Sequence, residues 1–306
     1  MIVRPQPGLL AILFTLHGSI LPQVALKILF VTVVACFVVA AEQHWPELLG
    51  LNAGVAPFTL VGLTLSIFLS FRNNACYERW WEARKQWGLL VVATRGLART
   101  TLALLPGPEQ EARRRRILSR LAGFAHSLHA SLRSTNAHVA AVPWLPEDEV
   151  QALAAHPNPA DGVLRYVAAD LADALRAGAI SDVLYGVFEE KLDALSQMQA
   201  ACERIKGTPL PFAYTLLIYR TSWLYCALLP FGLATSLGWA TPLLTALVAY
   251  TFFGLDALGD ELEEPFGLDA NDLPLNALLQ MVDSIVLDAL GEPAPPLIKP
   301  ERYVLR

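Results

Sequence analysis

The chain alternates between long apolar stretches near its two ends and a mixed polar and apolar stretch in the middle. Four apolar stretches carry almost no charge, and each approaches the roughly 20 residues that a helix needs to cross a bilayer. The expected transmembrane helices are residues 24–41, 55–71, 221–237 and 239–258. The pattern therefore predicts an all-α integral membrane protein with four transmembrane helices.

The rest of the chain is assigned around these helices, within one structural unit spanning residues 1–306. Residues 72–220 are expected to form a cytoplasmic helical region, and residues 259–306 a cytoplasmic C-terminal tail. Nothing after residue 71 interrupts the second helix before Pro106, so we expect it to continue far into the cytoplasm. The residues before position 24 predict an amphipathic segment at the membrane interface.

The distribution of lysine and arginine predicts the orientation. The connection over residues 42–54 has neither, whereas many follow residue 71 and three lie in the tail. Because cytoplasmic loops carry the excess of lysine and arginine, both termini and the middle region are expected in the cytoplasm.

Composition, charge and cysteine spacing exclude several classes of protein and site. The chain is 54% hydrophobic and 17% charged, which is typical of a membrane protein, and its net charge of −5 offers no basic surface for nucleic acid. The four cysteines form no CxxC pair, so neither a disulfide framework nor a zinc site is expected. The sequence indicates no cofactor.

A membrane enzyme is the main alternative class, and its best candidates are His126 and His129. Their i, i+3 spacing places both on one helix face, but neither a Glu-x-x-His pattern nor a third metal ligand accompanies them. Packed or hydrogen-bonded histidines are the simpler interpretation, and no hydrolase or nucleotide-binding motif is present. The uncharged span centres and the absence of repeats also disfavour a transporter.

The second apolar stretch has an unusual arrangement of side chains. Leu63, Ile67 and Phe71 recur every four residues and form one helical stripe, and Pro57 pre-sets the first turn. Such a stripe is typical of ordinary helix packing. Repeated around a symmetry axis, it becomes a ring of apolar side chains that gates ions by dewetting.

Several motifs resemble one known family. The run APFTLVGLTLSIFLSFRNNACYERWWEARKQWG, with Arg79, Trp80 and Trp81, is similar to the second helix of bestrophins. The opening IVRP, the segment TPLPFAYTLLIYRT and the segment EEPFGLDANDLPLNAL also resemble bacterial members, in the same order.

The resemblance implies a homopentamer in the cell membrane, the inner membrane of a bacterium, with one central pore. By position, the hydrophobic neck of that pore matches Leu63, Ile67 and Phe71. The family's cytoplasmic constriction falls in the segment AISDVLY, at Val183 or alternatively at Ile180. The implied partners are a second copy of the chain, the lipid bilayer and inorganic ions.

Animal bestrophins hold calcium in an acidic clasp after the last span. Here the matching stretch is interrupted by Leu268, Ala270 and Asn271, which leaves Asp269 and Asp272 as weak candidates for a metal site. We therefore expect no bound calcium, and interpret these aspartates as helix caps or inter-subunit contacts.

The ion that passes is predicted from charge near the inner end of the pore. An acidic cluster follows the last span and suggests small monovalent cations such as sodium or potassium. Its members are Asp256, Asp260, Glu261, Glu263 and Glu264. The basic face of Arg72, Arg79 and Arg84 favours the alternative, a chloride or anion channel. A non-conducting membrane scaffold is the third hypothesis.

Overall fold

The computed structural model describes residues 1–4, 8, 15, 18–45 and 54–305. The predicted interfacial segment before residue 24 lies largely outside the described residues. Within the described part, regular structure is helical, apart from isolated bridges of Ile2 and Glu301 with Val304. An all-α fold is confirmed.

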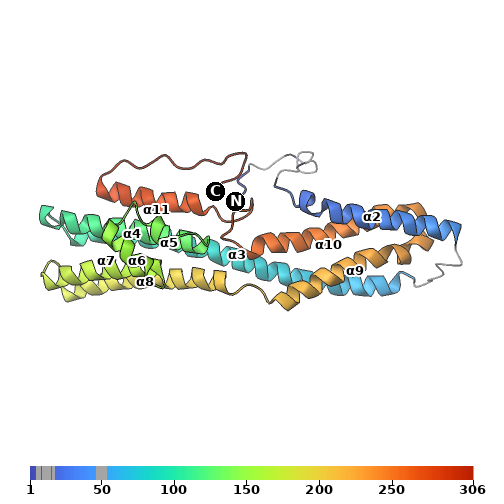
Figure 1. The fold of residues 1–306 in the computed structure, drawn as a ribbon, viewed down its shortest axis with the longest axis horizontal. Coiled ribbons are helices and arrows are strands. Elements are labelled where there is room, and N and C mark those ends of the chain that lie inside the picture. The colour runs from blue at the N-terminus through green and yellow to red at the C-terminus, as the bar shows by residue number, and fades with distance from the viewer. Residues whose placement is uncertain (5–7, 9–14, 16–17, 46–53, 306) are drawn as a thin grey trace. The chain divides into compact units, whose positions relative to one another are not determined.

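The described residues form the following helices (Figure 1). They are α2 (Leu21–His44), α3 (Ala56–Leu104), η1 (Pro108–Gln110), α4 (Glu111–Leu132), α5 (Ala137–Ala140), α6 (Glu147–Ala154), α7 (Pro159–Arg176), α8 (Asp182–Gly207), α9 (Phe212–Leu237), η2 (Gly238–Ala240), α10 (Thr241–Glu263) and α11 (Leu275–Leu290). Helix α3 is continuous for 49 residues and stops before Pro106, as the lack of a breaker predicted.

The chain divides into two compact units. Unit 1 contains Met1–Val3, Trp81–Thr208 and Phe266–Arg306, and unit 2 contains Arg4–Trp80 and Pro209–Pro265. These limits differ from the predicted division into residues 72–220 and 259–306. The C-terminal helix α11 belongs with unit 1 because its apolar face packs on α4, where Val286 joins a buried cluster with Leu118 and Ala122.

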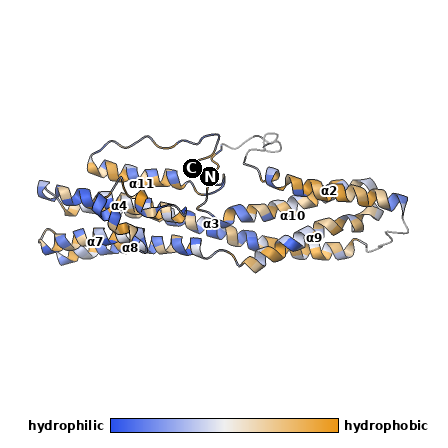
Figure 2. Ribbon diagram, in the orientation of Figure 1, coloured by the Kyte–Doolittle hydropathy of each residue, from blue (hydrophilic) through white to orange (hydrophobic). Residues whose placement is uncertain are grey.

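Unit 2 is built from apolar helices. Helices α2 and α9 are mostly hydrophobic, as is α10 before its acidic last turns, whereas α4, α7 and α8 mix both kinds of residue (Figure 2). By length and composition, two described stretches can cross a membrane: Leu21–His44, and Phe212–Glu263, which comprises α9, η2 and α10. Large apolar side chains such as Leu26, Phe37 and Leu243 are exposed on these helices, which suits a lipid environment.

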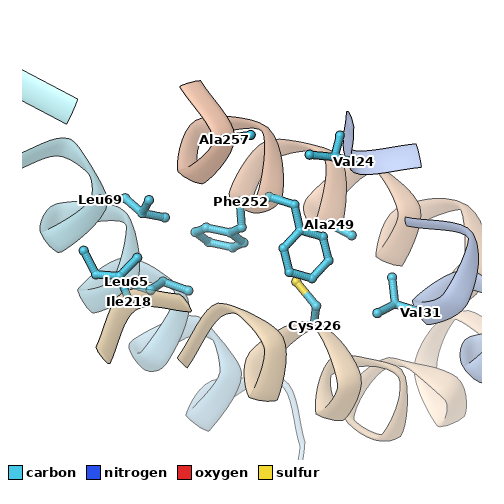
Figure 3. Packing of buried hydrophobic residues seen from close by; sticks show 10 residues of the cluster. Val24, Val31, Leu65, Leu69, Ile218, Cys226, Ala249, Phe252 and Ala257 are labelled. Carbon is cyan, nitrogen blue, oxygen red and sulfur yellow. The ribbon is translucent and has the colours of Figure 1, made fainter. Parts of the chain in front are cut away.

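The core of unit 2 joins all four of its long helices. Phe252 and Ala249 of α10 pack with Val31 of α2, Cys226 of α9 and Leu65 of α3 (Figure 3). In hydrocarbon, close packing rather than water exclusion holds helices together, so small residues at the contacts matter.

Gly232 of α9 gives one such close contact. A Cβ atom at this position would lie 2.4 Å from the ring of Phe58, so we expect Gly232→Ala to destabilise the protein by about 1–3 kcal/mol through overpacking. Gly254 of α10 is the matched control, because a Cβ there meets no atom within 4 Å. Thermal unfolding of the purified variants in detergent measures both changes. Equal midpoints for the two variants would contradict the contact.

Candidate functional site

The predicted neck residues form an exposed apolar stripe on α3. Leu63, Ile67 and Phe71 are 63%, 47% and 63% exposed in the single chain, and Pro57 lies in the first turn of the helix. Within unit 2 these three side chains are therefore free to face lipid, a pore or another subunit. Ordinary packing inside the subunit does not account for the stripe.

The opposite face of α3 fixes this stripe in place. Leu65 and Leu69 are buried in the core of unit 2. The hydroxyl of Tyr214 donates to the backbone carbonyl oxygen of Phe68 at 3.0 Å. At Gly62 a Cβ would lie 2.6 Å from the hydroxyl of Tyr225, so helix α9 approaches α3 closely there. One face of α3 is thus anchored while the apolar stripe projects outward.

An ion cluster joins α3 to α10 directly after the stripe. Arg72 follows Phe71, and its side chain is completely buried. Its Nη1 donates to the carboxylate of Asp256 at 3.0 Å and to the backbone carbonyl oxygen of Asp256 at 3.1 Å. Its Nη2 pairs with Asp260, and with Glu263 at 3.4 Å. We call Arg72, Asp256, Asp260 and Glu263 the Arg72 cluster.

Further contacts within unit 2 engage Glu261 and Glu263 near the end of α10. Glu261 accepts a hydrogen bond from the side-chain amide of Gln23 at 2.7 Å. Glu263 also accepts from the backbone N–H of Leu210 at 3.1 Å, whereas Glu264 is exposed. The five acidic residues that suggested a cation vestibule are therefore largely engaged with neighbouring groups.

The signature residues Arg79, Trp80 and Trp81 lie along the same helix. The Nε of Arg79 donates to the backbone carbonyl oxygen of Glu263 at 2.6 Å, which adds a second tie between α3 and the end of α10. Trp80 stacks on Tyr77 with ring centroids 6.5 Å apart, and Trp81 is exposed. The contacts of Arg79 and Trp80 thus support the placement of α3.

The two candidates for the cytoplasmic constriction differ in burial. Ile180 is only 4% exposed, whereas Val183, in the first turn of α8, is 73% exposed. The hydroxyl of Ser181 accepts from the backbone N–H of Leu184 at 3.3 Å and caps this helix. A side chain that narrows a pore must project out of its subunit, a condition that Val183 meets and Ile180 does not.

The stretch after α10 does not assemble a calcium site. Asp272 is buried, and its carboxylate accepts from the backbone N–H of Asp269 at 2.7 Å, which makes a local turn. No group of three or more histidine, cysteine or acidic side chains suited to a metal ion occurs among the described residues. The residues present do not fit the clasp of animal bestrophins.

The histidine pair has structural partners in unit 1. His126 contacts the carboxylate of Asp283 at 2.9 Å, and His129 contacts the side-chain oxygen of Asn276 at 2.9 Å, so both tie α4 to α11. Burial, reinforced by nearby Arg133, lowers the pKa of His129 to about 4, which keeps this ring neutral at physiological pH. Both histidines are therefore packed and hydrogen-bonded.

Apolar helices with lipid-suited surfaces, including exposed apolar side chains on α3, define an all-α membrane protein. Residues 1–288 match the family described as Bacterial/Fungal Bestrophin protein. A voltage-dependent anion channel-forming protein of Mesorhizobium japonicum is 46% identical over 304 residues, which is 99% of this chain and 96% of that protein. A voltage-dependent anion channel-forming protein of Escherichia coli is 38% identical to this chain over 304 residues, which is 99% of each chain.

Solved structures of bacterial bestrophin homologues also resemble this chain in fold and in sequence. A bacterial bestrophin homologue from Klebsiella pneumoniae is 39% identical with a TM-score of 0.85, covering 88% of this chain and 99% of that one. The chain therefore belongs to the bacterial bestrophin family. Since its relatives are channel-forming proteins, it is not an enzyme.

The predicted preference for cations is wrong. The curated relatives are named for anions, which supports the alternative interpretation instead. The charge argument set an acidic face against a basic face, whereas Arg72 is buried among Asp256, Asp260 and Glu263 and so does not belong to a separate basic face.

Sequence reasoning missed the role of Arg72. It treated this residue as part of a basic face, whereas the guanidinium is buried among three carboxylates. The sequence does contain an indication of this pairing. Asp256, Asp260 and Glu263 recur at i, i+4 and i+7 and therefore share one face of a helix. A basic residue at the end of a neighbouring span is the natural partner for such a face.

Proposed function

We propose that this chain is the subunit of a homopentameric anion channel, with one central pore that passes small monovalent anions such as chloride. Each subunit contributes four transmembrane helices, with both termini in the cytoplasm of a bacterial cell. The helices are α2, the first part of α3, α9 and α10. The relatives named as anion channel-forming proteins support the ion class.

The observation that carries the proposal is the exposed stripe of Leu63, Ile67 and Phe71, anchored from behind by buried residues of α3. Five copies around an axis turn this stripe into three stacked apolar rings. Such a neck bears no charge, so it restricts ions through the cost of removing their water. Val183, exposed at the start of α8, forms the second constriction in this proposal.

The direct test is the reversal potential of the purified protein in planar bilayers under a tenfold NaCl gradient. We expect the current to reverse near the chloride equilibrium potential. Replacing chloride with gluconate should abolish most of the current in the direction of chloride entry, and replacing sodium with N-methyl-D-glucamine should leave it unchanged. A reversal near the sodium potential contradicts the proposal. If neither the parent protein nor a variant with smaller side chains at Leu63, Ile67 and Phe71 conducts, the result favours a non-conducting scaffold.

A further inference from the structure

Most of the basic side chains on α4 and α7 of unit 1 are paired with acids. Arg115 pairs with Glu292, Arg116 and Arg120 with Asp170, Arg165 with Asp161, and Arg176 with Asp173. Other cations of unit 1 have no such pairing, and three of them border surface hollows. Arg95 and Arg99 of α3 and Lys191 of α8 have no hydrogen bond or ion pair to another residue in the described part of the chain. Their charges are available to an external ion.

These three cations border two neighbouring hollows on unit 1. One, of about 550 Å³, lies between α3 and α11 and includes Arg95, Arg99 and Asp288. The other, of about 580 Å³, lies between α3 and α8 and includes Arg99, Lys191 and Glu190. Arg99 borders both. Each hollow has two cations against one carboxylate, a local positive surplus in a chain whose net charge is −5.

The hollows are large enough for ions that keep their water. At roughly 30 Å³ per water molecule, each holds well over ten. The remaining lining of the α3–α8 hollow is largely uncharged, with Leu89, Val92 and Gly96 on α3. The ammonium of Lys191 lies against α3, 3.6 Å from where a Cβ of Gly96 would be, which is an ordinary van der Waals distance.

Helix geometry relates Lys191 to the second proposed constriction within unit 1. It follows Val183 by eight residues on α8, which is about two turns at roughly 3.6 residues per turn. The uncharged neck resists anions and cations alike, because dehydration is costly for both. Discrimination by sign therefore requires fixed charge elsewhere on the path, and the Arg72 cluster does not supply positive charge to it.

We infer that Arg99, with Arg95 and Lys191, is the charge-selecting element of the channel: a wet, positively charged stretch where permeant anions gather on their way through unit 1. This inference rests on the proposed function. Clefts lined by one sign of charge raise the local concentration of the opposite ion by about 10-fold or more. Neutralising the three cations should therefore weaken anion preference without widening or closing the neck.

The test compares two triple variants with the same change in charge. The first carries Arg95→Gln, Arg99→Gln and Lys191→Gln. The control carries Arg115→Gln, Arg165→Gln and Arg176→Gln, which removes three exposed but acid-paired cations of the same unit. Changes at exposed positions generally alter stability by less than about 0.5 kcal/mol, so both variants should fold.

We expect the chloride-to-sodium permeability ratio of the first variant to fall about fivefold or more, while the control keeps the parent ratio. Its conductance should fall about threefold in 0.1 M salt and approach the parent value in 1 M salt, where the Debye length shrinks from about 10 Å to about 3 Å. Arg99→Lys alone should keep the parent ratio, and Arg99→Gln alone should lose much of it.

The outcomes separate this inference from the proposed function. A parent channel that reverses near chloride, with an unchanged first variant, overturns the inference and leaves the anion channel intact. Equal shifts in both triple variants also overturn it, because total charge would then be responsible. A parent that reverses near sodium overturns the proposed function itself, and the inference with it.

Discussion

Replacing Leu63, Ile67 and Phe71 together by alanine is expected to raise the current of the channel about tenfold or more. In the proposed pentamer, three rings of large apolar side chains keep water out of a narrow pore, and an ion must shed its water to pass. Alanine widens all three rings and lets water in. A tenfold increase corresponds to a barrier lowered by only about 1.4 kcal/mol, a modest part of the cost of dehydration.

The increase is measured as macroscopic current and single-channel conductance in planar bilayers containing equal amounts of parent or variant protein. A matched control replaces three exposed apolar residues elsewhere in unit 2, Leu26, Leu243 and Leu247, by alanine. These lie on α2 and α10, so the control should conduct like the parent. If the neck variant carries no more current than the control, the stripe is not the gate.

The neck variant also separates a channel from a scaffold. In a scaffold the three side chains serve only to hold subunits together, so their truncation should weaken assembly and produce no ion flux. Size-exclusion chromatography of the same samples reports assembly, and bilayer recording reports flux. Intact assembly with raised current is the result that the channel requires.

Hydrophobic pattern was enough to predict most of the membrane-facing fold. Unit 2 consists of apolar helices whose positions are set by long uncharged runs, so α2, α9 and α10 fall where those runs lie. Their ends were harder to place. Helix α9 begins at Phe212, before the predicted 221, because TLLIYR continues the helix although it brings a charged residue with it.

Pairings between distant residues could not be predicted in the same way. Arg72 and Asp256 are 184 residues apart, and residue type alone does not say whether two charges meet or form separate surfaces. The prediction of cation preference failed at this step. Likewise, Ile180 and Val183 are equivalent as apolar residues in sequence, and only the fold shows that one is buried and the other exposed.

The Arg72 cluster gives the largest expected effect on stability. Changing Arg72 to methionine leaves Asp256 buried without the guanidinium that donates two hydrogen bonds to it, and removes the partner shared with Asp260 and Glu263. Removing one side of a buried ion pair typically costs about 3–5 kcal/mol, because the remaining charge stays out of water. We expect a loss of this size in the free energy of unfolding.

Thermal unfolding in detergent measures the loss, with Arg165→Met as the control because Arg165 forms an exposed i, i+4 pair with Asp161 worth at most about 0.5 kcal/mol. A second variant identifies the cause. Adding Asp256→Asn to Arg72→Met removes the uncompensated buried charge, so it should recover part of the lost stability. If Arg72→Met unfolds at the same temperature as Arg165→Met, the cluster does not hold α3 to α10. If Asp256→Asn recovers nothing, the loss comes from packing, since charge burial is then excluded as its cause.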